Sequence, residues 1–566
     1  MALVLPPDTS NGLVAAGPTD FVLINLEHLS TFGMPYPNGS ADLAAQFDTY
    51  SSNSNYTVWY FKVKPGLKWS DGENATANDI LSTFGPNFAL NATYDFPNVA
   101  PMIKTEYAAN STTAVFVLNS PNAHFPEVIS GFYFTMIYPA SYIAKEGPAG
   151  LYFNAPADGP FYVAQFTQGG SEMVLMRNPY FSPLPKICEI DVSFVESSSQ
   201  IPSLLKSGQV DLAPVDPSDV QALQQLPYIH IYQNPAHSFD GLQYNITSYP
   251  YNMTQFRQAL AYSINYTAVV SNGYSGLAIP ANNAQGEEPP SVTSWYNPNQ
   301  VTYSYNTTKA LLLLKSIGLT KGTDGYLHYA NGTKVSLTLW TDTKMPSDLL
   351  TSEILQKDFQ ALGMTINLVT TSISSEIGDY SSNIDGAQTA MHFYTQNGIT
   401  MQDPWLMSQP GWDTTWAMAL APPPKYWVYP AHAQTAYQSN LTALSSTDNT
   451  TLMRQYDYNI QALNAKYLPM IVTSYSSYPW AANTNAFGNW PSGYIIYGGN
   501  YLNQTALATI APKTTSSVST SSSSSSTSTS GLPSQTLLLA AVAVVVVVLV
   551  IGSVVVVSRK RSTKPA

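Results

Sequence analysis

The chain has 566 residues, which is long enough for two or three domains of ordinary size, and 44% of them are hydrophobic, enough to form folded cores. Only 10% of the residues are charged and the formal net charge is −12, which argues against a nucleic-acid partner because such a partner needs a basic surface. The single cysteine excludes an internal disulfide framework and a metal site with several cysteines.

The first well-defined elements lie between residues 56 and 80. Residues 56–61 (YTVWYF) are aromatic or β-branched and predict a strand, and Gly66 and Gly72 predict turns after it. A helix is expected to begin after Thr76, with Thr76 as its N-cap and Asp79 at the third helical position of a capping box. The whole run, YTVWYFKVKPGLKWSDGENATANDI, resembles the signature segment of the family 5 solute-binding proteins, the oligopeptide- and dipeptide-binding class of ABC importers.

Later segments resemble the same family in the same order. They are Asp158–Phe161, Met176–Phe181, Ile201–Asp211, Phe256–Ile264 and Tyr305–Gly318. Residues 347–369 predict an amphipathic helix followed, after Gly363, by a strand. The resemblance runs from about Asp42 to about Pro479.

The resemblance implies the fold class and the domain organisation. Such proteins have two α/β lobes joined by a hinge, with the ligand between the lobes, so we expect a two-lobed periplasmic-binding-protein-like type II fold with an extra subdomain in the first lobe. The first lobe is expected at 1–237 and 469–512, with 42–156 as the inserted subdomain. The second lobe is expected at 238–468.

Ligand contacts are expected between residues 394 and 416 of the second lobe. Asp403-Pro404 resembles the step that follows the family's ligand-contacting loop. In peptide binders of the family an aspartate a few residues earlier holds the peptide's α-amino group, but that position here is Thr400, which puts amine capture in doubt. Asn397 and Thr400 can hydrogen-bond a neutral ligand.

Three tryptophans beside this loop suggest a second class of ligand, an oligosaccharide. Their indole faces offer flat apolar area against which sugar rings can stack, although tryptophans also fill lobe cores. The predicted ligand-binding residues are therefore Asn397, Thr400, Asp403, Trp405, Trp412 and Trp416.

No catalytic motif points to an enzyme. The sequence has no His-Glu-x-x-His, no Gly-rich phosphate loop ending in Lys-Ser/Thr and no Gly-x-Ser-x-Gly, and its seven histidines are scattered without ligand spacing. We expect no catalytic residue, no metal site and no cofactor. Two carboxylates brought together by the fold would suffice for a glycosidase, so a hydrolase stays an alternative.

The C-terminal end predicts a membrane anchor. Residues 513–536 form a Ser/Thr-rich stalk, and residues 537–557 carry no charge and, as a helix, are just long enough to cross a bilayer core of about 30 Å. Basic residues in the tail at 558–566 place that tail in the cytoplasm. We therefore expect a single-pass protein of the cell membrane, of archaeal type, whose extracellular body is glycosylated at some of its Asn-x-Ser/Thr sequons.

The prediction for function combines these readings. The chain is expected to be a monomeric, membrane-anchored extracellular substrate-binding subunit of an ABC transporter, which captures oligopeptides and delivers them to permease subunits. The alternative within the same class is an oligosaccharide-binding subunit. The alternatives of another class are a surface adhesion protein and a tethered hydrolase.

Overall fold

The computed structural model describes most of the first 513 residues. The described residues are 1–8, 10, 18–29, 45–85, 100–129, 136–147, 150, 152–233, 238–286, 295–342, 345–371, 389–396, 403–408, 429–476, 479–492, 495–497 and 501–513. Residues 514–566 form a unit of their own and lie outside the described part, as do the predicted stalk from 514 on, the predicted span at 537–557 and the predicted tail. Along the described part, no helix has both the length and the apolar character that a bilayer crossing requires.

Two sheets bring the start and the end of the described chain together. The four-stranded sheet has the order β1-β8-β7-β6, in which only β1 and β8 are parallel. The three-stranded sheet has the order β10-β19-β9 and is antiparallel. The strands are β1 (Ala2–Val4), β6 (Phe161–Phe166), β7 (Glu172–Arg177), β8 (Glu189–Val195), β9 (Leu212–Pro214), β10 (Ile229–Tyr232) and β19 (Trp480–Asn483). The helices of these segments are α1 (Pro18–Glu27), α7 (Ile201–Ser207), α8 (Pro217–Leu223) and α18 (Gln504–Leu507).

A third, antiparallel sheet lies between α1 and β6 in sequence and is called the small sheet below. Its order is β2-β3-β5-β4. Its elements are β2 (Phe47–Ser52), β3 (Val58–Val63), α2 (Ala77–Phe84), β4 (Ile103–Asn110), β5 (Thr113–Leu118), α5 (Phe125–Val128) and α6 (Ala140–Glu146). The predicted strand at 56–61 is confirmed as β3.

The predicted capping box at the start of α2 is also confirmed. Thr76 is the N-cap, and its backbone N–H donates to Asp79 Oδ2 at 2.7 Å. The other oxygen of Asp79 accepts the backbone N–H of Ala140, also at 2.7 Å. One carboxylate therefore both begins α2 and holds the start of α6 against it.

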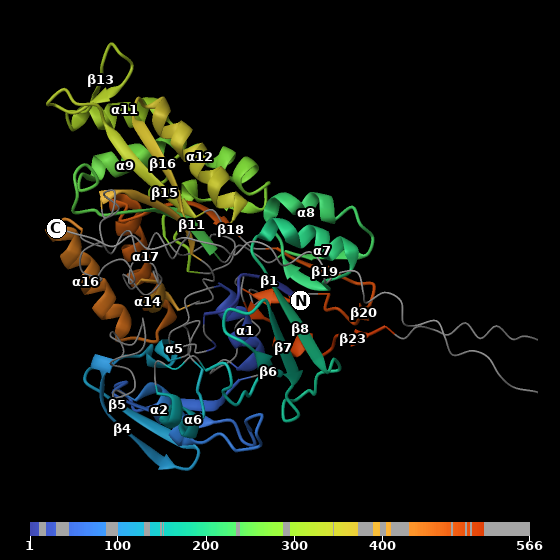
Figure 1. Ribbon diagram of the computed structural model, residues 1–566. Coiled ribbons are helices and arrows are strands. Elements are labelled where there is room, and N and C mark those ends of the chain that lie inside the picture. The colour runs from blue at the N-terminus through green and yellow to red at the C-terminus, as the bar shows by residue number, and fades with distance from the viewer. Residues whose placement is uncertain are drawn as a thin grey trace, which may run out of the picture. The chain divides into compact units, whose positions relative to one another are not determined.

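The largest sheet has six strands in the order β12-β18-β11-β17-β15-β16, and β15 is parallel to β16 and β17 (Figure 1). Its strands are β11 (Ser238–Tyr244), β12 (Ala278–Pro280), β15 (Ser336–Asp342), β16 (Thr365–Thr371), β17 (Met391–Gln396) and β18 (Ile471–Ser476). The helices of this part are α9 (Thr254–Ser263), α10 (Tyr266–Ala268), α11 (Thr307–Ser316), α12 (Pro346–Ala361), α14 (Pro404–Met407), α16 (Ala431–Ser445) and α17 (Thr450–Tyr467).

The helix and strand predicted over 347–369 are confirmed as α12 and β16. Gly363 joins them with a φ of +95°, and a Cβ there would lie 2.8 Å from the carbonyl oxygen of Gly325. Only glycine fits this turn without displacing the neighbouring backbone. Short two-stranded ribbons complete the fold: β13 (Thr320–Lys321) with β14 (Leu327–His328), β20 (Phe487–Gly488) with β23 (Ala511–Pro512), and β21 (Ile496–Tyr497) with β22 (Tyr501–Leu502).

The hydrophobic core is divided unequally among these sheets. One continuous cluster of buried side chains runs from the small sheet, with Phe61 and Phe116, to the six-stranded sheet, with Phe239 and Tyr475. The four-stranded and three-stranded sheets contribute most of two separate clusters. By packing, the small sheet is therefore joined to the six-stranded sheet, although in sequence it lies between elements of the four-stranded sheet.

Buried Arg257 fixes α9 to the end of α17, and its replacement provides a stability test. Its side chain is 3% exposed and donates to the carbonyl oxygens of Tyr467, Leu468 and Tyr251 at 2.9, 2.9 and 2.6 Å. A lysine lacks the planar fork and leaves buried carbonyls unpaired, so Arg257→Lys should lower the free energy of unfolding by about 2–4 kcal/mol in urea denaturation. Gln258→Ala, which removes an exposed hydrogen bond from the same helix, should change it by less than about 0.5 kcal/mol. Equal losses in the two variants would contradict this role.

Glu27, at the end of α1, makes the stability of the fold depend on pH. It is fully buried; burial is the main cause that raises its pKa from 4.5 to about 8, and a hydrogen bond from Ser10 opposes the shift. Between these pH values the folded chain holds a proton that the unfolded chain has released, so stability falls as the pH rises from about 4.5 to about 8.

The variant Glu27→Gln cannot ionise and tests this dependence. At roughly 1.4 kcal/mol per pKa unit, the loss of unfolding free energy between pH 5 and pH 8 should be smaller in Glu27→Gln than in the natural chain by about 2–5 kcal/mol. Urea denaturation at the two pH values measures the difference. Glu172→Gln, at an exposed position of β7, should keep the natural pH dependence; the same dependence in all three chains would exclude Glu27 as its source.

Candidate functional site

One edge of the six-stranded sheet collects the features of a binding site. Because β15 is parallel to β16 and β17, the carboxyl ends of these three strands lie at the same edge. The antiparallel strand β11 begins there, with Phe239 opposite Gln396, and β18 ends there, with Ser476 opposite Ser238. Ligands of α/β sheets commonly bind outside the carboxyl ends of parallel strands.

The chain crosses between the three-stranded and six-stranded sheets twice, and both crossings attach to this edge. One crossing leads from β10 to β11 and the other from β18 to β19. Buried Asp240 fixes the attachment, since its carboxylate accepts hydrogen bonds from the hydroxyls of Ser474 at 2.7 Å and Ser476 at 2.8 Å. The edge therefore faces the part of the molecule that contains β9, β10 and α8.

A direct contact spans the same junction. Asp216 is the N-cap of α8, where its Oδ1 accepts the backbone N–H of Ser218 at 2.9 Å. Its other carboxylate oxygen accepts the backbone N–H of Ser347, at the start of α12, at 3.4 Å. The N-terminal ends of α8 and α12 thus meet around one buried carboxylate.

Buried polar atoms without partners occur near the carboxyl end of β15 and in the first two turns of α12. All belong to side chains no more than 2% exposed, and within the described part of the chain none has a hydrogen-bond partner. They are Trp340 Nε1 and the hydroxyl oxygens of Thr341, Ser347, Thr351 and Ser352. A buried polar group without a partner costs roughly 1–3 kcal/mol, so this group of donors is suited to a polar ligand.

A conservative substitution tests whether these hydroxyls are unsatisfied. Thr341→Val keeps the shape of the side chain and removes a buried hydroxyl, so it should raise the free energy of unfolding of the solute-free protein by about 1 kcal/mol in urea denaturation. Thr365→Val changes an exposed hydroxyl on the neighbouring strand β16 and should have an effect below about 0.5 kcal/mol. Destabilisation by Thr341→Val would mean that the hydroxyl already has a partner.

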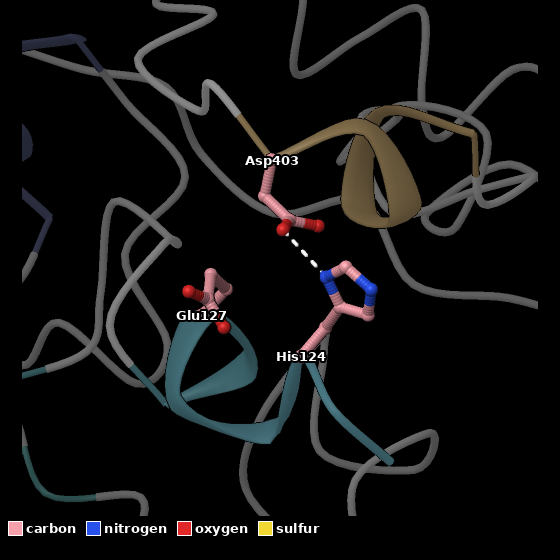
Figure 2. A group of neighbouring side chains, drawn as sticks. All are labelled: His124, Glu127 and Asp403. Carbon is pink, nitrogen blue, oxygen red and sulfur yellow. Dashed lines mark hydrogen bonds and ion pairs between the residues drawn. The ribbon is translucent and has the colours of Figure 1, made fainter. Parts of the chain in front are cut away.

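A second cluster of polar side chains lies where the α5 turn meets α14 and α16. Figure 2 shows His124 and Glu127 on the α5 turn, with Asp403 facing His124. His124 Nδ1 is 2.6 Å from Asp403 Oδ2, and His124 Nε2 is 2.9 Å from the carbonyl oxygen of Leu444 and 3.1 Å from that of Thr447. Because carbonyl oxygens only accept, Nε2 carries a hydrogen and Nδ1 faces the carboxylate.

Burial and neighbouring charges shift the pKa values of His124 and Glu127. Burial is the main cause that raises the pKa of Glu127 to about 7; Asp403 adds to the shift and His124 opposes it. Burial alone would lower the pKa of His124, but Asp403, with a smaller contribution from Glu127, raises it above its usual value. His124 therefore favours its protonated form beside Asp403, and Glu127 retains a proton up to about pH 7.

The structure describes two of the six predicted ligand-binding residues. Asp403 pairs with His124, and the indole ring of Trp405 stacks on the His124 imidazole with ring centroids 5.9 Å apart. Trp405 is 4% exposed and belongs to the continuous core cluster. Asn397, Thr400, Trp412 and Trp416 lie outside the described residues, and a ligand role for all six stays a prediction.

Sequence reasoning missed His124 and Glu127. They are 279 and 276 residues from Asp403, so no spacing along the chain relates them to it. The hydroxyls at the start of α12 were missed because their burial depends on how α12 packs. The one local signal was the pair His124 and Glu127, three residues apart, which a helical turn brings to one side.

Comparisons with known proteins agree with this architecture. A sequence model described as bacterial extracellular solute-binding proteins, family 5 middle region, matches residues 41–418. The dipeptide-binding protein of Escherichia coli K12 is 24% identical over 381 residues, which cover 62% of this chain and 67% of that protein.

Two solved structures share the fold over almost all of their length. NikZ from Campylobacter jejuni, in complex with Ni(L-His), superposes with a TM-score of 0.75 at 18% identity and covers 90% of this chain and 98% of its own. An oligopeptide-binding protein of Thermotoga maritima bound to mannohexaose has a TM-score of 0.73 at 18% identity. The superposition covers 91% of this chain and 98% of that protein.

These matches define the class of the protein as a two-lobed α/β binding protein of the periplasmic-binding-protein type, which confirms the predicted fold class at that level. The family match covers well over half of the chain. The chain belongs to family 5 of the bacterial extracellular solute-binding proteins. This is a family of binding proteins, which agrees with the expectation that the chain is not an enzyme. The lobe boundaries and the inserted subdomain at 42–156 stay predictions.

Proposed function

We propose that this chain is the substrate-binding subunit of an ABC importer and that it captures oligopeptides for delivery to permease subunits. Membership of family 5 supports the transport role, and the similarity to a dipeptide-binding protein supports a peptide ligand. The observation that carries the proposal is the group of unpartnered donors at the carboxyl end of β15 and the start of α12. It lies at the edge to which both crossings attach.

The donors suit an extended peptide. Each peptide unit offers a carbonyl oxygen, which accepts from an indole N–H or a hydroxyl, and an N–H, which donates to a hydroxyl oxygen. A solute held at this edge can contact the carboxyl end of β15 on one side and the α8 end around Asp216 on the other. Because such a solute binds the closed state more tightly than the open state, it shifts the population toward closure.

An oligosaccharide is the second candidate. The unpartnered donors at the edge are all uncharged and include one indole, a set that suits sugar hydroxyls as well as peptide groups. Thr400 also stands where peptide binders of the family have the aspartate that holds the amine. The mannohexaose-bound relative has the same fold and is consistent with this choice.

The proposal includes attachment to the cell membrane. Three segments support a single-pass anchor with the body outside the cell. They are the Ser/Thr-rich stalk at 513–536, the uncharged stretch at 537–557 and the basic tail at 558–566. The protein would be of archaeal type, and its body would act as a monomer. The body would carry glycans on some sequons and would need no cofactor. Tethering keeps the binding protein within reach of its permease.

A thermal-shift screen of the purified full chain tests the function and identifies the ligand. The chain is mixed with di- to hexapeptides and with gluco-, manno- and xylo-oligosaccharides. A solute at a hundredfold excess over its dissociation constant should stabilise the fold by about 2.7 kcal/mol, seen as a higher melting temperature. A shift with peptides alone supports the peptide proposal, and a shift with sugars alone supports the alternative.

The variants at Thr341 on β15 and Thr365 on β16 test whether the ligand binds at this edge. Thr341→Val should reduce the ligand-induced shift, while Thr365→Val should leave it unchanged. Chromatography of the recovered solute separates binding from hydrolysis, because a binding protein returns the solute intact. Absence of a shift with every solute, or cleavage of the solute, would contradict the proposed function.

A further inference from the structure

Three side chains from two distant parts of the chain present possible metal ligands at one point. His124 and Glu127 lie on the α5 turn, and Asp403 immediately precedes α14. One ligand atom from each residue lies within 4.8 Å of the other two (Figure 2). Two ligands of one tetrahedral zinc ion lie about 3.3–3.6 Å apart, since each bond is about 2.0–2.2 Å long, so small side-chain rotations bring all three into range.

The imidazole of His124 is oriented as a metal ligand requires. Its Nε2–H donates to the carbonyl oxygens of Leu444 and Thr447, which leaves Nδ1 directed at the carboxylates. Metal-bound histidines almost always donate their second ring N–H in this way, to a carbonyl, a carboxylate or water. The backbone N–H of Ala123 donates to the carbonyl oxygen of Ser445 at 2.9 Å, and Trp405 stacks on the ring, so both the loop and the imidazole are held in place.

Glu127 supplies an independent indication of a cation-binding position. Its Oε2 is buried, and within the described part of the chain it accepts no hydrogen bond. Among the described residues no lysine or arginine forms a salt bridge with Glu127 either. A buried carboxylate oxygen without a donor or a cation is costly, and metal coordination is one of the ways in which proteins satisfy it.

We propose that His124, Glu127 and Asp403 bind one divalent transition-metal ion. One imidazole nitrogen with two carboxylate oxygens is a ligand set that suits Zn²⁺, Ni²⁺ and Co²⁺ better than Mg²⁺ or Ca²⁺, which prefer oxygen alone. The metal takes the place of the hydrogen between His124 Nδ1 and Asp403 Oδ2, and these atoms separate from 2.6 Å to roughly 3.3–3.6 Å. Three protein ligands leave at least one coordination position for water.

The bound ion would join two parts of the molecule. It would connect the α5 turn, which follows the small sheet, to α14, which belongs to the helices beside the six-stranded sheet. The proposal goes beyond solute capture and does not depend on whether the solute is a peptide or a sugar.

Metal binding to the full chain tests the proposal directly. The protein is stripped with a chelator and titrated with Zn²⁺ in a calorimeter, and bound metal is counted by elemental analysis. We expect one Zn²⁺ per chain, at least a hundredfold weaker binding of Mg²⁺ and Ca²⁺, and a visible Co²⁺ spectrum typical of mixed nitrogen and oxygen ligands. His124→Gln and Glu127→Gln should each weaken Zn²⁺ binding at least tenfold and change the Co²⁺ spectrum.

A matched control separates this cluster from other histidine–carboxylate pairs. His328 Nε2 lies 3.4 Å from Asp324 Oδ2 at a more exposed position. His328→Gln should therefore leave Zn²⁺ binding unchanged. Glu127→Gln keeps the size of the side chain, and its melting temperature without metal verifies that it is folded. Absence of stoichiometric Zn²⁺, equal weakening by His328→Gln, or unchanged binding in the folded Glu127→Gln variant would overturn the proposal.

Discussion

The structure depends on the two chain crossings that attach to one edge of the six-stranded sheet. Because β11 begins and β18 ends at the edge where β15, β16 and β17 end, this edge adjoins both crossings to the three-stranded sheet. The buried carboxylate of Asp240 holds the two crossing strands together through Ser474 and Ser476. The position of the candidate solute site follows from this connectivity.

The sequence was sufficient to predict a structural element where the signal is local, and to predict the fold where the family pattern is specific. The capping box of Thr76 and Asp79 was predictable because both partners lie within one helical turn. The succession of α12 and β16 was predictable because the hydrophobic period changes once, at Gly363. The two-lobed fold came from the ordered resemblance to family 5, since periodicity alone does not specify how the sheets are connected.

The sites could not be read in the same way, because they depend on burial and on contacts between distant segments. Thr351 and Ser352 read as ordinary helix residues, and only the packing of α12 makes their hydroxyls buried. His124 and Asp403 become neighbours only because the α5 turn lies against the start of α14. Trp405 lies in the core with His124 stacked on it, a contact that sequence could not show, and its ligand role stays a prediction.

The small sheet is held on two sides at once by hydrogen bonds to different parts of the chain. On one side Gln46 donates to Asp158 at 2.8 Å and the backbone N–H of Ala157 donates to Ser70 at 3.0 Å, close to β6. On the other side the backbone of Ala123 and the ring of His124 bind the end of α16. With the lobes as predicted, at 1–237 with 469–512 and at 238–468, their separation would break the hydrogen bonds to the end of α16. If release of the proposed solute requires this separation, its residence time depends on a contact that does not touch the edge of β15.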